Sequence, residues 1–501
     1  MTRREILAAG AATALVQGQT PPPDAKQDAA ESPKQKPSKM SPPQPTAPRP
    51  YPFPKPVHRQ LSNALNVYVI EDHRLPVVTY ALEMLAGNCD VEPAKSGLPS
   101  LVAGLLREGA GTRTSPEISS LVDGCGGSMG ASAGDDITTA GGTFMKSYAP
   151  LGLGLLADIV LRPRFEQEEM NRRVEQVLSG LAVNLDDPGY LIPLVASRVI
   201  LGRHPYAYPG DGTPETISGL RREDLTTFWK RYYAPDRAWF AISGDITPEE
   251  GFRMAEQAFG AWKVDKDAAA NKVLPPPIPR GARVVIVDMP QAVQTQLVIG
   301  HTGIPRKHPD FMALNVANQI FGGSFNSRLN MKIRAKEGLT YDASSGLEAQ
   351  RQAGVFTVNT FTRTEKTAEA VRMIVDLLKE FRDNPAQQDE FDEAKSFISG
   401  SFALATETSG QVAERILMAA VNGLGEDYWT QYRERLDALT IGQVRAAVQG
   451  FLEPDKLAIV AVGNAKAFSK ELAAYGPATV IPQAELDLIA DSLRKAQAGA
   501  K

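Results

Sequence analysis

The sequence is poor in the residues that build metal sites and disulfide frameworks. Its 501 residues include five histidines, and no two of them stand four apart, as the helical pair of a zinc site requires. The only cysteines are Cys89 and Cys125. Two cysteines exclude a disulfide framework but leave open either a single bridge or two free thiols.

An excess of positive charge and long apolar runs are also absent. The formal net charge is -4, and we find no basic stripe, which argues against a nucleic-acid-binding protein. No run approaches eighteen consecutive apolar residues, which excludes an integral membrane domain. The composition, 43% hydrophobic and 22% charged, is that of an ordinary globular protein long enough for two to four domains.

The N-terminal region differs from the rest. Residues 1–19 combine a basic start with a short alanine-rich apolar run, and T-R-R-E-I-L resembles a twin-arginine export signal. We therefore expect a protein exported to the periplasm or the cell exterior, with a disordered N-terminus as the alternative. Residues 20–56 follow, with thirteen prolines between Pro21 and Pro56, and are predicted to form an extended linker.

The body of the chain repeats one pattern of elements. A Pro-Asp turn followed by an apolar strand ending in Gly-Asp or Gly-Asn occurs at Pro235 and again at Pro454, about 219 residues later. We predict an α+β fold of two homologous α/β sandwich domains, each a mostly antiparallel sheet with helices packed on one face. The predicted boundaries are 57–268 and 280–480, with a linker at 269–279 and a tail at 481–501.

Predicted elements recur in the same order in both halves. Those of the first half are strands at 65–70, 77–85 and 137–145 and helices at 98–108, 151–160 and 168–185. Those of the second are strands at 283–287, 295–300 and 354–361 and helices at 311–321, 366–381 and 388–402.

One segment, Ser324 to Tyr341, stands out for its chemistry. It is predicted to be a short helix carrying Arg328, Leu329, Ile333 and Arg334, which Gly338 ends because glycine readily adopts the left-handed conformation. One helical turn and a glycine reversal would bring Arg334 and Tyr341 to the same cleft. Both donate hydrogen bonds, which suits a carbonyl oxygen that gains negative charge.

The pattern S-R-L-x-x-x-I-R-x-K-E-G-L-T-Y in this segment resembles the C-terminal half of the insulinase/pitrilysin-type peptidases. These are the inverted zincins, and they include mitochondrial processing peptidases and two-chain bacterial members. The resemblance extends from about Val57 to about Pro477 and implies that Arg334 and Tyr341 bind a substrate carbonyl. The alternative is a helix charge paired with Glu337 and a tyrosine packed within a strand.

The same resemblance shows what the first half lacks. Catalytic members carry His-x-x-Glu-His on the helix matching 98–108 and a further glutamate downstream, which together bind zinc and activate water. The four matching positions here are Ser100, Ala103, Gly104 and Gly180. We expect this chain to bind no metal, and neither its nearby carboxylates nor its histidines are predicted ligands: Glu108, Glu175, His58, His73, His204, His301 and His308.

The function that the resemblance implies is that of a zinc-free subunit. It would supply Arg334 and Tyr341 to a homologous partner chain that carries the zinc, for proteolysis of an unfolded peptide added as a strand to a sheet edge. One alternative is a non-enzymatic scaffold or peptide-binding chain. An autonomous metallopeptidase with unorthodox ligands is the other, which four small residues disfavour. The partner is either a second gene product or a second copy of this chain.

Overall fold

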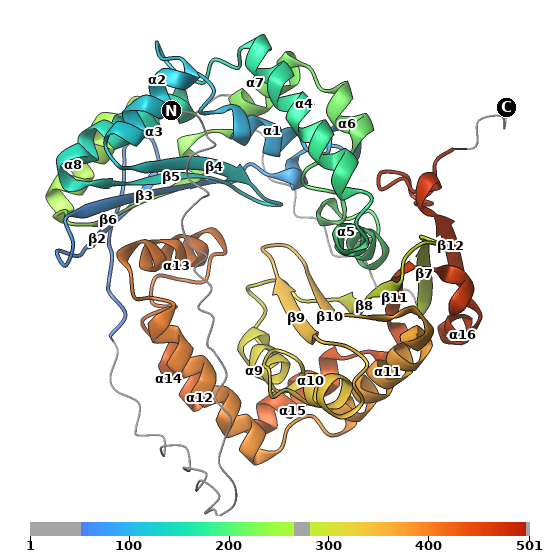
Figure 1. Ribbon diagram of the computed structural model, residues 1–501. Coiled ribbons are helices and arrows are strands. Elements are labelled where there is room, and N and C mark those ends of the chain that lie inside the picture. Colours follow the sequence, from blue (N-terminus) through green and yellow to red (C-terminus); the bar gives the residue numbers. More distant parts are fainter. Residues whose placement is uncertain (1–51, 265–280, 497–501) are drawn as a thin grey trace, which may run out of the picture. The chain divides into compact units, whose positions relative to one another are not determined.

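The computed structural model describes residues 52–264 and 281–496. The predicted export signal, most of the proline-rich segment and the predicted linker at 269–279 lie outside the described residues. The structure describes two six-stranded sheets, each accompanied by helices (Figure 1).

The first sheet has the strand order β1-β2-β6-β3-β5-β4. Strands β2 and β6 are parallel, and every other neighbouring pair is antiparallel. The strands are β1 Val57–Gln60, β2 Asn66–Glu71, β3 Val77–Met84, β4 Ser128–Ala133, β5 Thr138–Met145 and β6 Ala238–Gly244.

The second sheet repeats this arrangement in the order β12-β7-β11-β8-β10-β9. From β7 to the edge strand β9, each strand has the same position and pairing direction as its equivalent in the first sheet, including the parallel pair β7 and β11. Only β12 differs, because it pairs parallel to β7, whereas β1 pairs antiparallel to β2. The strands are β7 Arg283–Asp288, β8 Gln294–Thr302, β9 Ala343–Ala349, β10 Gly354–Arg363, β11 Ala458–Gly463 and β12 Ala478–Pro482. The prediction of two homologous α/β domains is confirmed.

The helices of the first half are α1 Leu98–Leu105, α2 Ser115–Gly124, α3 Ala149–Leu161, α4 Gln167–Asn184, α5 Pro188–Leu201, α6 Pro214–Gly219, α7 Arg222–Tyr232 and α8 Pro248–Phe259. Those of the second are α9 Phe311–Phe321, α10 Arg328–Asn330, α11 Thr367–Asp383, α12 Gln388–Leu404, α13 Ser409–Val421, α14 Tyr432–Ala438, α15 Ile441–Phe451 and α16 Ser469–Leu472. The predicted helix at 311–321 matches α9, while α1 ends at Leu105 rather than at residue 108.

Two helices absent from the prediction, α5 and α13, connect the halves. Helix α13 of the second half packs against β2, β3 and β6 of the first sheet, on the face opposite α3 and α8 (Figure 1). Helix α5 of the first half packs against β8 and β11 of the second sheet. Each sheet therefore has its own helices on one face, as predicted, and one helix from the other half on the opposite face.

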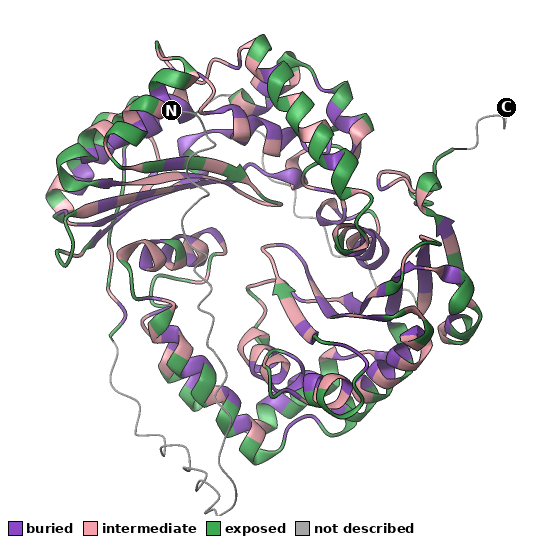
Figure 2. Cartoon of the chain, viewed as in Figure 1, coloured by how far each residue is buried: buried purple, intermediate pink, exposed green. Residues whose placement is uncertain are grey.

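Strand alternation explains how both faces are buried. In β2, Val67 and Val69 belong to the core of the first half, whereas Tyr68 and Ile70 share a core with α13. Every residue of the central strand β11 is buried, which is the pattern of a strand covered on both sides (Figure 2). Two sheets with two apolar faces each thus require the exchange of helices between halves.

The segment predicted as a tail, residues 481–501, contributes to the core between α5 and the second sheet. Ile481 lies in β12, and Leu488 and Leu493 follow it, and all three are buried with α5. Packing of the second half therefore extends past residue 480. Among the described residues, no helix combines the length and the apolar character needed to cross a bilayer.

Candidate functional site

The segment that carries Arg334 and Tyr341 is anchored by buried side chains. The Ser327 hydroxyl accepts a hydrogen bond from the Asn330 backbone N–H and caps α10, and the helix then widens into a π-helical turn over Met331–Lys336. Leu329 and Ile333 are fully buried in the core of the second half. The predicted stop is present, because Gly338 has φ +62° and its N–H donates to the Arg334 carbonyl at 3.2 Å.

Arg334 projects from this turn toward an exposed aromatic ring. Its guanidinium carbon lies 4.6 Å from the ring centre of Phe325, and Phe325 itself is 67% exposed. Glu337 forms its ion pair with Lys332, at 3.2 Å, and not with Arg334. The alternative of an Arg334–Glu337 surface pair is therefore wrong.

Tyr341 is more exposed than any other large apolar or aromatic residue of the segment, at 81%. The backbone on both sides of it is fixed, since Thr362 donates to the Leu339 carbonyl at 2.7 Å and Thr360 donates to the Asp342 carbonyl at 2.8 Å. Its phenol is not packed within a strand. The side chains of Arg334 and Tyr341 have no hydrogen-bonding or ion-pair partner among the described residues.

The four positions that match the zinc motif lie on α1 and α4. Ser100 and Gly180 line one cavity of about 290 Å³ between these helices, and Ala103 is buried beside it. The Ser100 hydroxyl donates to the Gly210 carbonyl at 2.9 Å. The structure therefore brings two of the four aligned positions, Ser100 and Gly180, to the same cavity.

A residue that the sequence analysis did not single out, Arg173, occupies this place. A Cβ atom at Gly104 would lie 3.2 Å from the Nε and Nη2 atoms of Arg173. The guanidinium thus fills the space into which a side chain at position 104 would extend. A fixed positive charge and four positions without histidine, cysteine or a carboxylate do not fit a zinc ion. The described part of the chain also contains no cluster of three or more acidic, histidine or cysteine residues suited to a metal.

Each histidine contacts ordinary protein groups at a separate place in the fold. The contacts are those of His58 with Glu426, His73 with Asp245, His204 with Tyr206, His301 with Thr302 and His308 with Asp310. Glu108 accepts hydrogen bonds from Ser115 and Arg172. Both cysteines are free thiols, so the single bridge is absent.

A buried polar junction between the halves was not predicted. The Gln350 amide donates to the Asp135 carboxylate at 2.9 Å, and the Gln352 backbone N–H donates to the Tyr206 hydroxyl at 3.1 Å. Burial raises the pKa of Asp135 to about 6. These partners are more than sixty residues apart in the chain, so no local sequence signal marks the junction.

Comparison with known proteins finds a family model that matches part of this chain and several relatives of similar length. Residues 219–398 match the family described as "Peptidase M16 inactive domain". An uncharacterized zinc protease of Streptomyces coelicolor is 24% identical over 75% of this chain and 82% of that protein. A protein of Helicobacter pylori called a non-peptidase homolog, YmxG, is 22% identical over 82% of this chain and 94% of that one.

Solved structures of proteins with similar names have the same fold as this chain. The crystal structure of a peptidase M16 inactive domain from Pseudomonas fluorescens has a TM-score of 0.76 and 28% sequence identity, covering 81% of this chain and 98% of that one. A protease from Helicobacter pylori has a TM-score of 0.77 at 20% identity and shares the fold, covering 82% of this chain and 99% of that one. The resemblance to the insulinase/pitrilysin-type peptidases is confirmed.

Proposed function

From the premise that this chain is a relative of the M16 peptidases, we propose that it is the zinc-free subunit of a two-chain metallopeptidase. It contributes Arg334 and Tyr341, and a homologous partner contributes the zinc site. The observation that carries the proposal has two parts. Tyr341 is exposed and Arg334 is half-buried, and neither side chain has a hydrogen-bonding or ion-pair partner in the described residues, while the positions on α1 and α4 lack metal ligands.

The role of the pair follows from its chemistry. A guanidinium and a phenol that hold a peptide carbonyl also hold the negative charge that develops on its oxygen when water attacks the carbon. Zinc in the partner supplies the activated water. Because the backbone around Arg334 and Tyr341 is anchored by Ile333 and by the threonines of β10, the donors need little reorganisation.

The peptide strand belongs on a sheet edge of the partner. The outer edge of β9, which begins two residues after Tyr341, is already engaged, because the Ser345 N–H donates to the Gly322 carbonyl at 3.0 Å. The Ser345 carbonyl also accepts a hydrogen bond from the Asn318 amide at 3.2 Å. A peptide bound by strand addition to the partner would therefore contact Arg334 and Tyr341 without pairing to β9.

Purification of the tagged full chain from its native host tests the proposal. We expect a co-purifying homologue that carries His-x-x-Glu-His, stoichiometric zinc in the complex, and cleavage of an unfolded peptide by the complex only. Zinc-dependent cleavage by the isolated chain would contradict it. We extend the proposal to export through residues 1–19, which fractionation of the native cells would check.

A second candidate, a non-enzymatic scaffold or peptide-binding chain, is favoured by the Helicobacter pylori relative called a non-peptidase homolog. The same purification separates the two. A complex that binds an unfolded peptide but contains no zinc and cleaves nothing would support the scaffold.

A further inference from the structure

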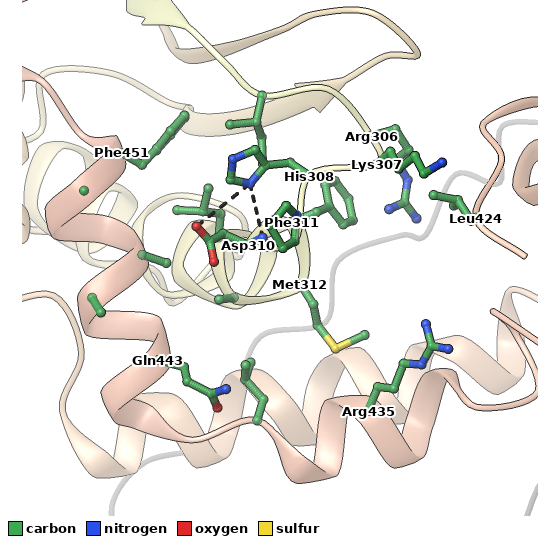
Figure 3. A pocket seen from close by; sticks show the side chains of 18 of the residues that line it. Arg306, Lys307, His308, Asp310, Phe311, Met312, Leu424, Arg435, Gln443 and Phe451 are labelled. Atoms are coloured by element: carbon green, nitrogen blue, oxygen red, sulfur yellow. Dashed lines mark hydrogen bonds and ion pairs between the residues drawn. The ribbon is translucent and has the colours of Figure 1, made fainter.

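A pocket of about 760 Å³ lies in the second half, apart from Arg334, Tyr341 and the cavity of α1 and α4. Its walls are the loop before α9, the first turn of α9, the α13–α14 connection, and helices α14 and α15 (Figure 3). This volume is within the range of small-molecule sites in proteins. Nothing in the proposed peptidase function uses it.

Three cationic side chains gather on one side of the pocket: Arg306, Lys307 and Arg435 (Figure 3). The guanidinium carbons of Arg306 and Arg435 lie 5.2 Å and 5.7 Å from the ring centre of the same residue, Tyr428. In the described part of the chain, none of the three cations has an acidic partner within ion-pair distance. The acidic residue of the lining, Asp310, lies 3.9 Å from His308 instead.

Arg306 is held in place before any ligand arrives. Its guanidinium carbon lies 3.7 Å from the ring centre of Phe311, and its Nη2 atom donates to the Tyr428 hydroxyl at 3.0 Å. Its backbone N–H donates to the Gln350 carbonyl at 2.7 Å. A guanidinium fixed between two rings loses little rotamer freedom when it binds an anion, and such preorganisation favours binding.

The wall formed by α15 has the opposite character. It presents Gln443, Ala446, Ala447, Gly450 and Phe451, none of which is charged. A Cβ atom at Gly450 would meet nothing within 4 Å, so this wall leaves open space. The pocket thus has a cationic end and an uncharged, largely apolar end.

We propose that this pocket binds an anionic amphiphile, a carboxylate with an apolar chain of medium length. The carboxylate lies at Arg306, Lys307 and Arg435, and the chain extends along α15. A peptide fits less well, because the helical walls keep their backbone hydrogen bonds internal and offer no strand edge. The first turn of α9 adds partial positive charge to the same pocket.

Calorimetry on the full chain tests this with four probes: decanoate below its micellar concentration, 1-decanol, acetate and hexaglutamate. We expect saturable binding of one decanoate per chain, at least about tenfold tighter than binding of 1-decanol or acetate. Such a result would show that binding requires both the carboxylate and the apolar chain. No saturable decanoate binding, or tighter binding of hexaglutamate than of decanoate, would overturn the proposal.

Variants separate the two ends of the pocket. Lys307→Gln and Arg435→Gln should each weaken decanoate binding about tenfold and leave 1-decanol unchanged, because each removes a charge-assisted contact. Gly450→Met should weaken both ligands by filling the open wall. Lys379→Gln, on the exposed face of α11, is the matched control. Equal affinities in the control and the pocket variants, with all of them folded by circular dichroism, would place the ligand elsewhere.

Discussion

Arg328 binds Glu390 through two parallel hydrogen bonds, from Nε to Oε1 at 2.7 Å and from Nη2 to Oε2 at 2.5 Å. Its third nitrogen donates to the Asn384 carbonyl at 2.7 Å. Burial opposes ionisation of Glu390, but the hydrogen bonds from Arg328 and from the Gln387 backbone N–H outweigh it and lower the pKa of that carboxyl. Arg328 therefore joins α10 to α12, whereas Arg334, six residues later, has no such partner in the described chain.

Replacing each of the two arginines of the motif should change the free energy of unfolding by different amounts. We expect Arg328→Ala to lower the free energy of unfolding by about 2 kcal/mol, since it leaves the half-buried Glu390 carboxylate unpaired. Arg334→Ala should change it by less than about 0.5 kcal/mol. Urea denaturation of the full chain measures both. Equal destabilisation would mean that Arg334 is also structural.

Activity should show the reverse pattern. In the zinc-containing complex, Arg334→Ala and Tyr341→Phe should each lower kcat/KM about 100-fold, because each removes a donor to the developing oxyanion. The matched controls are Arg382→Ala and Tyr148→Phe, which change exposed residues of the same types. Full activity of the two site variants in a correctly assembled complex would remove the role assigned to them.

Metal removal should affect the complex and not the isolated chain. Treatment of the isolated chain with a chelator is expected to leave its Tm unchanged, because Arg173 and the small residues of α1 and α4 provide no zinc site. The same treatment of the complex should abolish cleavage, and added zinc should restore it. A chelator-dependent fall in the Tm of the isolated chain would reveal a metal site in this chain.

Stability should depend on the protonation of Glu83, which lies on the face of β3 that α13 covers. Burial, and then the charge of Glu414 on α13, raise the pKa of Glu83 to about 7. The folded state therefore takes up a proton as pH falls through about 7, while the unfolded state does so only near its ordinary value of 4.5. Stability from this group is present at low pH and is lost as pH rises from about 4.5 through 7.

The variant Glu83→Gln should remove this part of the pH dependence. We expect it to exceed the parent protein in stability at pH 8 by on the order of 2 kcal/mol and to match it near pH 4. Urea denaturation at a series of pH values measures the difference. A variant that is less stable than the parent at pH 8 would contradict the sign of the effect.

The two halves should fold only together. Separated, the first sheet would expose the face that α13 covers, and the second sheet would expose the face that α5 covers. We expect residues 52–264 and 281–496 to aggregate when produced singly and to form a soluble complex when produced together. Independent, cooperative unfolding of either half alone would show that the exchanged helix is dispensable.

Local patterns were enough to predict much of the fold. The helix at 311–321 has an amphipathic stripe that ends at Gly322, and β10 alternates along its length, so both were placed from neighbouring residues alone. Helix α5 was missed because it contains Pro193 and is buried along most of its length, which blurs the helical period. Tertiary contacts, and not its own pattern, decide where it lies.

The sequence by itself determined the duplicated order of elements, the turn at Gly338 that follows Arg334, and the absence of histidine and glutamate at Ser100, Ala103, Gly104 and Gly180. Each depends on residue identity or on neighbours within a few positions. Only the tertiary structure decided that α5 and α13 exchange sheets and that Arg173 fills the space beside Gly104. Those outcomes depend on which apolar faces pack together and which side chains fill open space. Such contacts join residues far apart in the chain, so local sequence patterns cannot predict them.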